Sequence, residues 1–244
     1  MNRKKTLIII GICIVAIIGF GFYRHLYSQN EDGIAYIKSE ERKKTDDIAT
    51  ALKDKKNEET QKAIDEGKID VFAKFQDYVL IGDSRVLGFS QYGFLPENRV
   101  YAKTGSRVTD IDEYIESLKS LQPNNVYISF GANDIVSQLD NLEGGYDGVT
   151  EAEINKILEV CPNATIYVNG IVPFGQAAID DQAVLADYTK YNEKLESMCK
   201  KNKWNYIDND SIVDDGNADV YQSDGIHFIN DFYKTWAMNM TKEE

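Results

Sequence analysis

Short apolar runs alternate with amphipathic segments along the chain from about Asp70 onward. Several of these runs are apolar throughout, which is typical of strands in a parallel sheet that is covered on both faces. The expected strands are Tyr78–Gly82, Arg99–Ala102, Asn125–Phe130, Ala164–Val168 and Trp204–Asp208. We therefore expect one sheet of about five parallel strands.

Segments with apolar residues at helical spacing lie between the expected strands. Thr150 and Glu153 form a capping-box pattern at the start of one of these segments. Strands that alternate with helices over this length predict an α/β domain of three layers, α/β/α, with right-handed crossovers. The expected helices are Val108–Leu121, Glu151–Val160, Asp187–Lys201 and Asn230–Met240.

Residues 7–23 carry no charged side chain, whereas Arg3, Lys4 and Lys5 precede them and Arg24 follows. At 1.5 Å per residue such a helix reaches roughly 26 Å, near the thickness of the hydrocarbon layer of a membrane. The basic residues hold the N-terminus in the cytoplasm, so the rest of the chain crosses the membrane. We interpret residues 1–28 as a cytoplasmic tip and transmembrane signal-anchor, and a cleaved signal peptide is the alternative.

Residues 29–69 are rich in Lys, Glu and Asp and contain few aliphatic side chains. Because such a segment cannot bury a core of its own, we interpret it as a charged stalk or linker, helical or partly disordered. Residues 70–244 then form the domain that holds the core, and we expect it to lie outside the cytoplasm on a single-pass membrane protein.

Charge and cysteine content narrow the function classes. A formal net charge of -13 without a basic stripe would repel nucleic acid, which we exclude as a partner. Cys161 and Cys199 each stand near the end of an expected helix, and either a disulfide or two separate buried thiols fits. Neither cysteine has the histidine neighbours or paired spacing of a metal site, so we expect neither a metal nor another cofactor. The oligomeric state stays open.

Four short motifs follow expected strands or lie near the C-terminus. The carboxyl ends of parallel strands meet at one edge of a sheet, where binding and catalysis concentrate. The motifs should therefore converge. They are Gly82-Asp83-Ser84-Arg85, Lys103-Thr104-Gly105, Gly131-Ala132-Asn133-Asp134 and Asp224-Gly225-Ile226-His227.

Ser84 and His227 are the candidate nucleophile and general base. A hydroxyl needs a base whose pKa is near neutral pH, and the only other histidine, His25, lies beside the expected anchor. Asp224 precedes His227 by three residues, a spacing that lets its carboxylate hold one imidazole nitrogen while the other faces Ser84. The alternatives are structural, because serine and aspartate are both common helix caps.

Three groups are candidate donors to an oxyanion. The Ser84 N–H would lie at a helix start, the Asn133 amide follows an apolar strand, and Gly105 offers a backbone N–H. Asn133 also suits an Asx turn, and Gly105 suits a position with positive φ, so a structural role explains each of them equally well.

Taken together, these motifs resemble the four signature blocks of the SGNH, or GDSL-type, hydrolases. The matching positions are Ser84 in Gly-Asp-Ser, Gly105, Asn133 in Gly-x-Asn-Asp, and His227 with Asp224. The resemblance covers about residues 75–244. It implies a flavodoxin-like sheet and a metal-independent Ser-His-Asp mechanism, with the N–H groups of Ser84 and Gly105 and the Asn133 amide as the oxyanion hole. Arg85 stands where the family's name has leucine, and we expect it not to touch the chemistry.

The substrate is expected to be chosen by two segments, Ser137–Val149 and Pro173–Asp187. The first is rich in Gly, Asp and Asn, with Tyr146 as a possible aromatic platform, which suits a sugar better than a long acyl chain. We therefore expect a small acyl ester, an O-acetyl ester on an envelope or extracellular glycan, as substrate. The alternatives are a lipase, thioesterase or acyltransferase on the same site, or a non-catalytic glycan-binding module.

Overall fold

The computed structural model describes residues 36, 38–45, 47–52, 55, 59, 62, 63, 66, 70–213 and 218–242. The chain divides into two compact units, Met1–Glu66 and Gly67–Glu244. The predicted membrane anchor, residues 1–28, lies outside the described residues. Over the ranges that are described, no helix has the length and apolar character needed to cross a bilayer.

In the first unit, the described residues of the predicted stalk between 36 and 52 are helical. Their side chains are mostly exposed, including the apolar Ile48 and Leu52. Local contacts join neighbouring turns: the Thr45 hydroxyl donates to the Glu41 carbonyl at 2.8 Å, and Lys43 pairs with Glu40 at 3.0 Å. We expected this segment to be helical or partly disordered, and its described residues between 36 and 52 are helical.

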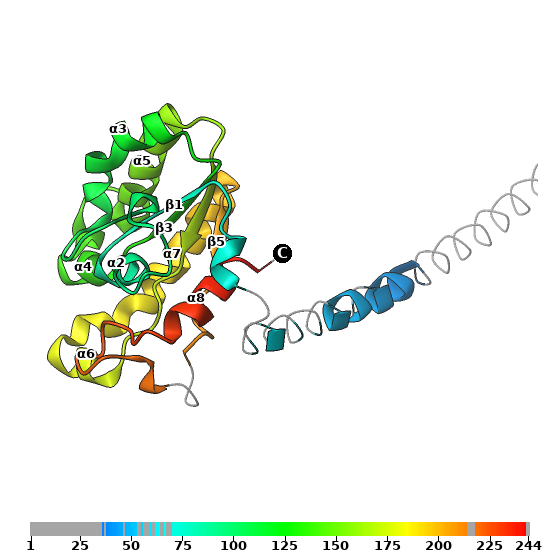
Figure 1. Ribbon diagram of the computed structural model, residues 1–244. Helices are drawn as coiled ribbons and strands as arrows, with labels where there is room; N and C mark the ends of the chain where they lie inside the picture. The colour runs from blue at the N-terminus through cyan, green and yellow to red at the C-terminus, as the bar shows by residue number, and fades with distance from the viewer. Residues whose placement is uncertain are drawn as a thin grey trace, which may run out of the picture. The chain divides into compact units, whose positions relative to one another are not determined.

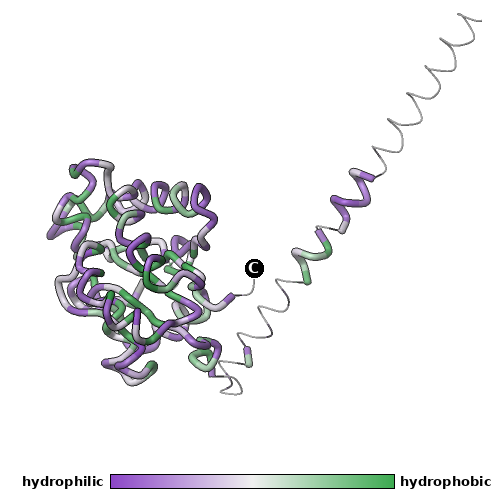
Figure 2. The backbone as a smooth tube through the Cα atoms, turned by 90° about the horizontal axis from the view of Figure 1, so that it is seen from above, coloured by the Kyte–Doolittle hydropathy of each residue, from purple (hydrophilic) through white to green (hydrophobic). Residues whose placement is uncertain are grey.

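The second unit is built on one sheet of five parallel strands in the order β2-β1-β3-β4-β5, which confirms the predicted sheet (Figure 1). All residues of β1 are buried, as expected for a central strand. Figure 2 shows hydrophobic segments gathered inside the unit, with many polar segments on its outside. The strands are β1 Tyr78–Gly82, β2 Val100–Ala102, β3 Asn125–Ser129, β4 Thr165–Asn169 and β5 Asn205–Ile207.

Helices pack on the sheet in two groups. Leu118, Ile154 and Leu195, from α3, α5 and α7, share one core cluster with Val79 and Ile81 of β1. Helices α2 and α8 meet instead through an aromatic cluster, which is described below. The α-helices are α2 Ser84–Gln91, α3 Ile115–Leu121, α4 Ala132–Val136, α5 Gly145–Val160, α6 Gln176–Asp181, α7 Tyr188–Asn202 and α8 Phe232–Met240. The 3-10 helices are η1 Val71–Lys74, η2 Glu97–Arg99, η3 Val108–Tyr114, η4 Leu139–Asn141, η5 Ala183–Asp187 and η6 Ala218–Val220.

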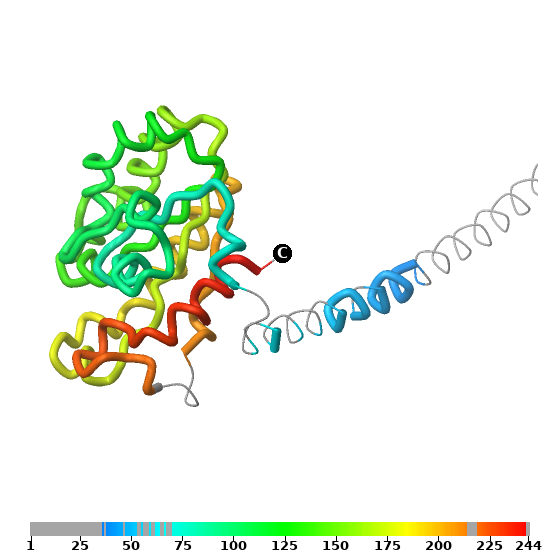
Figure 3. Tube along the Cα trace, in the orientation of Figure 1, coloured from blue at the N-terminus to red at the C-terminus, as the bar shows by residue number. Residues whose placement is uncertain are grey.

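The chain runs from β1 into α2 and returns through α8 near the C-terminus (Figure 3). On this side of the unit, Phe89 of α2 lies 4.8 Å from Tyr233 and 5.3 Å from Trp236, both in α8, measured between ring centroids. All three rings are buried. Helix α8 therefore closes the core over the helix that begins at Ser84.

The predicted capping box at Thr150 and Glu153 is wrong. Helix α5 begins at Gly145, after Gly144 in a left-handed conformation, so both residues lie inside the helix. The Thr150 hydroxyl donates to the Tyr146 carbonyl at 2.8 Å, and Glu153 pairs with Lys156 at 2.9 Å. The expected helix Val108–Leu121 also differs, since its first half is the 3-10 helix η3.

Cys161 and Cys199 are both buried, free thiols. The Cys161 thiol donates to the Leu118 carbonyl at 3.3 Å. Burial raises the pKa of both thiols, that of Cys199 to about 12. Of the two alternatives, the structure therefore has separate thiols rather than a disulfide.

Candidate active site

Ser84 is the first residue of α2, directly after the carboxyl end of β1. Asp83 caps this helix, because its carboxylate accepts the Arg85 N–H at 2.9 Å. The cap is thus Asp83 and not Ser84, which removes the structural alternative for the serine. A Cβ at Gly82 would lie 2.3 Å from the Ser129 carbonyl oxygen, so the tight passage from strand to helix needs glycine there.

His227 lies in a compact loop between η6 and α8. The carbonyl of His227 accepts the Gln222 N–H at 2.7 Å, and the Ile229 N–H donates to the Val220 carbonyl at 2.8 Å. Gly225 adopts a φ of 68° in the turn. These bonds fold the loop back on itself and define where its histidine lies.

The structure brings Ser84, Asp224 and His227 together. The distance from His227 Nε2 to Ser84 Oγ is 2.9 Å, and that from His227 Nδ1 to Asp224 Oδ2 is 2.6 Å. Asp224 Oδ1 accepts the N–H groups of Ile226 and His227 at 2.9 Å each. Burial alone would raise the pKa of Asp224, but the hydrogen bonds from His227 and the two backbone N–H groups outweigh burial and lower it.

The loop that carries Gly105 lies against the start of α4. The Asn133 amide donates to the Ser106 carbonyl at 3.0 Å, and the Ser106 hydroxyl donates to the Gly82 carbonyl at 3.0 Å. Gly105 has a φ of 80°, a conformation that favours glycine. Ser106, the residue after Gly105, thus joins two of the motifs by hydrogen bonds, through Gly82 at the end of β1 and Asn133 after β3.

Two residues of the motifs, Asp83 and Asp134, have buried carboxyl groups. Asp134 Oδ1 accepts the Val108 N–H at 2.9 Å, which ties α4 to the start of η3. Burial raises the pKa of Asp134 to about 7, with this hydrogen bond acting in the opposite direction and the Asp83 charge in the same one. Burial also raises the pKa of Asp83, partly offset by Arg85.

Arg85 occupies a position that the sequence analysis set aside. Its side chain is buried, and its guanidinium donates to the carbonyls of Val172 at 2.9 Å and Pro173 at 3.1 Å. The guanidinium carbon lies 4.8 Å from the centre of the Phe174 ring and 4.4 Å from that of Phe228, the residue after His227. The sequence offered one signal for this burial, because the arginine stands beside apolar residues on a short helix. A guanidinium buried there requires acceptors for its hydrogens.

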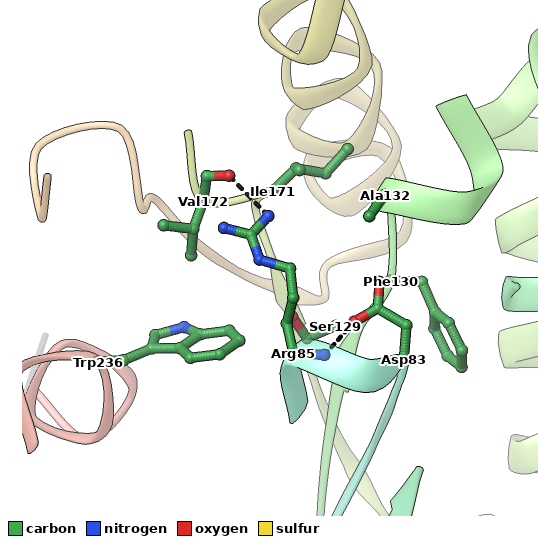
Figure 4. A pocket seen from close by; sticks show the side chains of 8 residues that line it. All are labelled: Asp83, Arg85, Ser129, Phe130, Ala132, Ile171, Val172 and Trp236. Atoms are coloured by element: carbon green, nitrogen blue, oxygen red, sulfur yellow. Dashed lines mark hydrogen bonds between the residues drawn. The ribbon is translucent and has the colours of Figure 1, made fainter. Parts of the chain in front are cut away.

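A small cavity lies beside Arg85 (Figure 4). At about 10 Å³ it has room for roughly one water molecule, so it is too small to hold an ester substrate. It is lined by Asp83, Arg85, Ser129, Phe130, Ala132, Ile171, Val172 and Trp236.

The two segments expected to choose the substrate are largely helical. Ser137–Val149 contains η4 and the start of α5, while Pro173–Asp187 contains α6 and η5. The predicted aromatic platform at Tyr146 is wrong, because its side chain is only 1% exposed and packs 4.9 Å from the Tyr191 ring. Helix α5 begins one residue before Tyr146 and turns the ring into the core.

A model of the GDSL-like Lipase/Acylhydrolase family matches residues 83–234. No curated protein matches the chain.

Solved structures share the fold. A proposed acylhydrolase from Bacteroides fragilis is 19% identical, with a TM-score of 0.52 over 68% of this chain and 88% of that one. A GDSL-like lipase from Bacteroides thetaiotaomicron is 16% identical, with a TM-score of 0.51 over 72% and 92%. A catalytic mutant of an acetylxylan esterase from Geobacillus stearothermophilus is 15% identical, with a TM-score of 0.50 over 68% and 94%.

Proposed function

Because the chain belongs to the GDSL-like lipase/acylhydrolase family, it is an ester-hydrolysing enzyme, and we propose that it is a serine esterase. In this proposal Ser84 is the nucleophile, His227 is the general base and Asp224 orients the histidine. All three residues lie within the segment that matches the family.

One observation carries the proposal. The Ser84 hydroxyl, the His227 ring and the Asp224 carboxylate form a continuous chain of contacts at 2.9 Å and 2.6 Å, although Ser84 and His227 are 143 residues apart. A serine hydroxyl is a weak nucleophile at neutral pH and is activated by a base within hydrogen-bonding distance. The carboxylate selects the tautomer in which Nδ1 carries the proton, so that Nε2 is free to accept one from Ser84.

The proposed reaction has two halves. His227 Nε2 accepts the Ser84 proton while Oγ attacks the ester carbonyl carbon. When the C–O bond to the alcohol breaks, His227 gives this proton to the leaving oxygen and the acyl group stays on Ser84. Water then attacks the acyl-enzyme and gives a proton to His227, the carboxylic acid leaves, and Ser84 recovers its proton.

The developing oxyanion is bound by the N–H groups of Ser84 and Gly105 and by the Asn133 amide. The Ser84 N–H belongs to the first turn of α2, where N–H groups have no carbonyl partner within the helix. One amide hydrogen of Asn133 is used on Ser106, which orients the side chain and leaves its second hydrogen for the oxyanion. Donors of this kind contribute about 3 kcal/mol each in the transition state.

The substrate of this proposal is a small acyl ester, an O-acetyl group on an envelope or extracellular carbohydrate. Its support is the polar, exposed character of the segment after α4, where Ser137, Gln138, Asn141 and Glu143 are all exposed. Such side chains suit the hydroxyl groups of a sugar better than a long acyl chain. An acetylxylan esterase is also among the proteins that share the fold.

The proposed location is the outer face of a membrane, with residues 1–28 as a single-pass anchor and residues 29–69 as the stalk. The apolar run at residues 7–23 and the basic residues before it support this location.

A serine-directed fluorophosphonate tests the proposed function on the full chain. We expect the wild type to be labelled and to hydrolyse p-nitrophenyl acetate, whereas Ser84→Ala and His227→Ala lose both reactions. Ser90→Ala is the matched control, because Ser90 lies in the same helix and donates to the Leu87 carbonyl. Equal labelling of all four proteins would contradict the proposal.

Esters of increasing acyl length, together with acetylated xylooligosaccharides, test the substrate class. Faster turnover of acetyl than of octanoyl esters supports the small-acyl proposal, and the reverse order supports a lipase.

A further inference from the structure

We propose that Arg85 is a positioning residue that holds the loop carrying His227 in register with Ser84. The inference rests on the proposed function, because it concerns how the base is kept at the nucleophile. The expectation that Arg85 does not touch the reacting atoms stays a prediction, because the role proposed here acts through the loop.

Arg85 holds the segment on which the histidine loop rests. Its two terminal nitrogens bind the carbonyls of Val172 and Pro173, which follow β4. The Pro173 carbonyl also accepts the Tyr221 hydroxyl at 2.8 Å, so the same residue is bound from the nucleophile helix and from the histidine loop. Figure 4 shows the Arg85 side chain running toward Val172 and away from the Asp83 carboxylate.

The backbones of the two segments also touch. The Gly175 N–H donates to the Gly225 carbonyl at 2.8 Å. A Cβ at Gly175 would lie 3.0 Å from the Gly225 Cα, and one at Gly225 would lie 2.7 Å from the Ala178 nitrogen. A movement of the segment after β4 is therefore passed directly to the turn that holds Asp224 and His227.

The guanidinium carbon lies over the rings of both Phe174 and Phe228. Phe228 is joined by a peptide bond to His227 and is fully buried, so its ring fixes the backbone next to the imidazole. Contact with two rings together with hydrogen bonds to two carbonyls suits a flat, forked cation. Lysine keeps the charge but lacks that geometry, and leucine lacks both.

The backbone of Arg85 completes the link to α8. Its carbonyl accepts the buried Tyr233 hydroxyl at 2.9 Å. Arg85 thus contacts the segment after β4, the histidine loop and α8, and it is itself bonded to Ser84 along the chain. A displacement of about 1 Å between nucleophile and base is enough to lower a rate by about 100-fold.

The test compares Arg85→Met and Arg85→Lys with the wild type in the full chain, using p-nitrophenyl acetate and the labelling rate with fluorophosphonate. For Arg85→Met we expect kcat to fall by about 100-fold with KM within about threefold of the wild type, because binding groups are untouched and only the approach of base to nucleophile changes. The kcat of Arg85→Lys should lie between that of Arg85→Met and that of the wild type.

Arg99→Met is the matched control for stability. Arg99 also donates to a backbone carbonyl, that of Tyr78 at 3.0 Å, but at the amino end of β1. Thermal unfolding followed by circular dichroism is measured for each variant, and activity is assayed well below each Tm. We expect Arg99→Met to lower Tm while keeping kcat.

The outcomes separate this inference from the proposed function. A folded Arg85→Met protein with the kcat of the wild type, or an equal loss of kcat in Arg99→Met, overturns the positioning role alone. If Arg85→Met does not fold, Arg85→Lys and Phe174→Leu decide: lowered kcat supports the role, and unchanged kcat in both overturns it. A wild type without hydrolysis or labelling overturns the proposed function and this inference with it.

Discussion

The Asp224 carboxylate contacts both the backbone of its own turn and the ring of His227. It accepts two backbone N–H groups and faces His227 Nδ1, and the hydrogen bonds keep its pKa below the ordinary value despite burial. The residue is therefore ionised at neutral pH, where the proposed mechanism needs a negative partner for the imidazolium.

We predict that Asp224→Asn lowers kcat by about 10³- to 10⁴-fold with a small change in KM. Asparagine retains an acceptor for the backbone, but its amide hydrogens can face Nδ1 and favour the tautomer whose Nε2 already carries a proton. Steady-state kinetics with p-nitrophenyl acetate measures the effect. Asp231→Asn removes the same charge at the N-cap of α8 and should keep kcat. A loss below about tenfold in Asp224→Asn would argue against the assignment.

In Asp134, unlike Asp224, the effect of burial on the pKa outweighs that of the hydrogen bonds, so the pKa is raised. Its pKa is about 7 in the folded protein against 3.8 for an exposed carboxyl group. The folded state thus binds the proton more tightly than the unfolded state. The resulting stability is present at low pH and is lost as the pH rises from about 4 through about 7.

For Asp134→Asn we expect this pH dependence to disappear. An amide keeps the acceptor for the Val108 N–H and never ionises. The free energy of unfolding of the wild type, relative to the variant, should fall by about 2–3 kcal/mol between about pH 5 and about pH 8. Urea unfolding of both proteins at each pH checks this, and a constant difference would mean that Asp134 does not titrate in this range.

At the scale of elements, the contact between α2 and α8 depends on a glycine. The Tyr233 hydroxyl would lie 1.8 Å from a Cβ at Gly88, and this tyrosine is buried and bound to the Arg85 carbonyl. Its ring also packs against those of Phe89, Tyr92 and Trp236. Helix α8 can therefore approach the helix of Ser84 only if position 88 has no side chain.

Alanine at Gly88 and alanine at Gly148, both in helices, should change the free energy of unfolding in opposite directions. Gly88→Ala is expected to lower the free energy of unfolding by about 1–3 kcal/mol through overpacking. Gly148→Ala in α5 meets nothing within 4 Å and should raise it by about 0.5–1 kcal/mol, because alanine loses less backbone entropy on folding. Chemical unfolding of both variants measures the pair, and destabilisation by Gly148→Ala as large as that by Gly88→Ala would refute the argument.

At the scale of the whole molecule, the chain has a charged N-terminal unit and a second unit with its own core. The described residues of the proposed stalk are mostly exposed, whereas the second unit buries apolar side chains between its sheet and helices. The proposed anchor at residues 1–28 would then tether the domain without taking part in the reaction.

We predict that the full chain fractionates with membranes and resists extraction by alkaline carbonate. Removal of residues 1–28 should release the protein into the aqueous fraction with unchanged kcat on p-nitrophenyl acetate. The anchor contributes apolar surface for the bilayer, whereas the candidate site residues all lie beyond residue 80. Recovery of the full chain in the aqueous fraction would exclude the anchor.

Much of the fold could be predicted because its signals are local. The largely continuous apolar runs at Tyr78–Gly82 and Asn125–Phe130 are typical of strands buried on both faces, and the structure has strands at both places. The expected meeting of Ser84 with His227 combined two arguments: parallel strands end at a common edge, and His227 is the only histidine beyond the expected anchor, with Asp224 three residues before it. Neither argument required coordinates.

Other features could not be predicted because distant contacts decide them. Tyr146 enters the core since α5 begins earlier than its capping pattern indicates, and its ring packs against Tyr191 of α7. Cys161 and Cys199 are separate buried thiols, and the sequence had left a disulfide open. Residues 1–28 and parts of 29–69 lie outside the described structure, so the anchor stays a prediction from sequence.

By itself, the sequence determined the strands, most of the helices and the four motifs, because periodicity and turn chemistry act over a few neighbouring residues. Only the tertiary structure decided the 2.9 Å contact between Ser84 and His227 and the burial of Arg85 against two aromatic rings. Arg85 and Val172 are 87 residues apart in the chain. The partners of a buried cation are chosen by packing in three dimensions, and no local pattern records them.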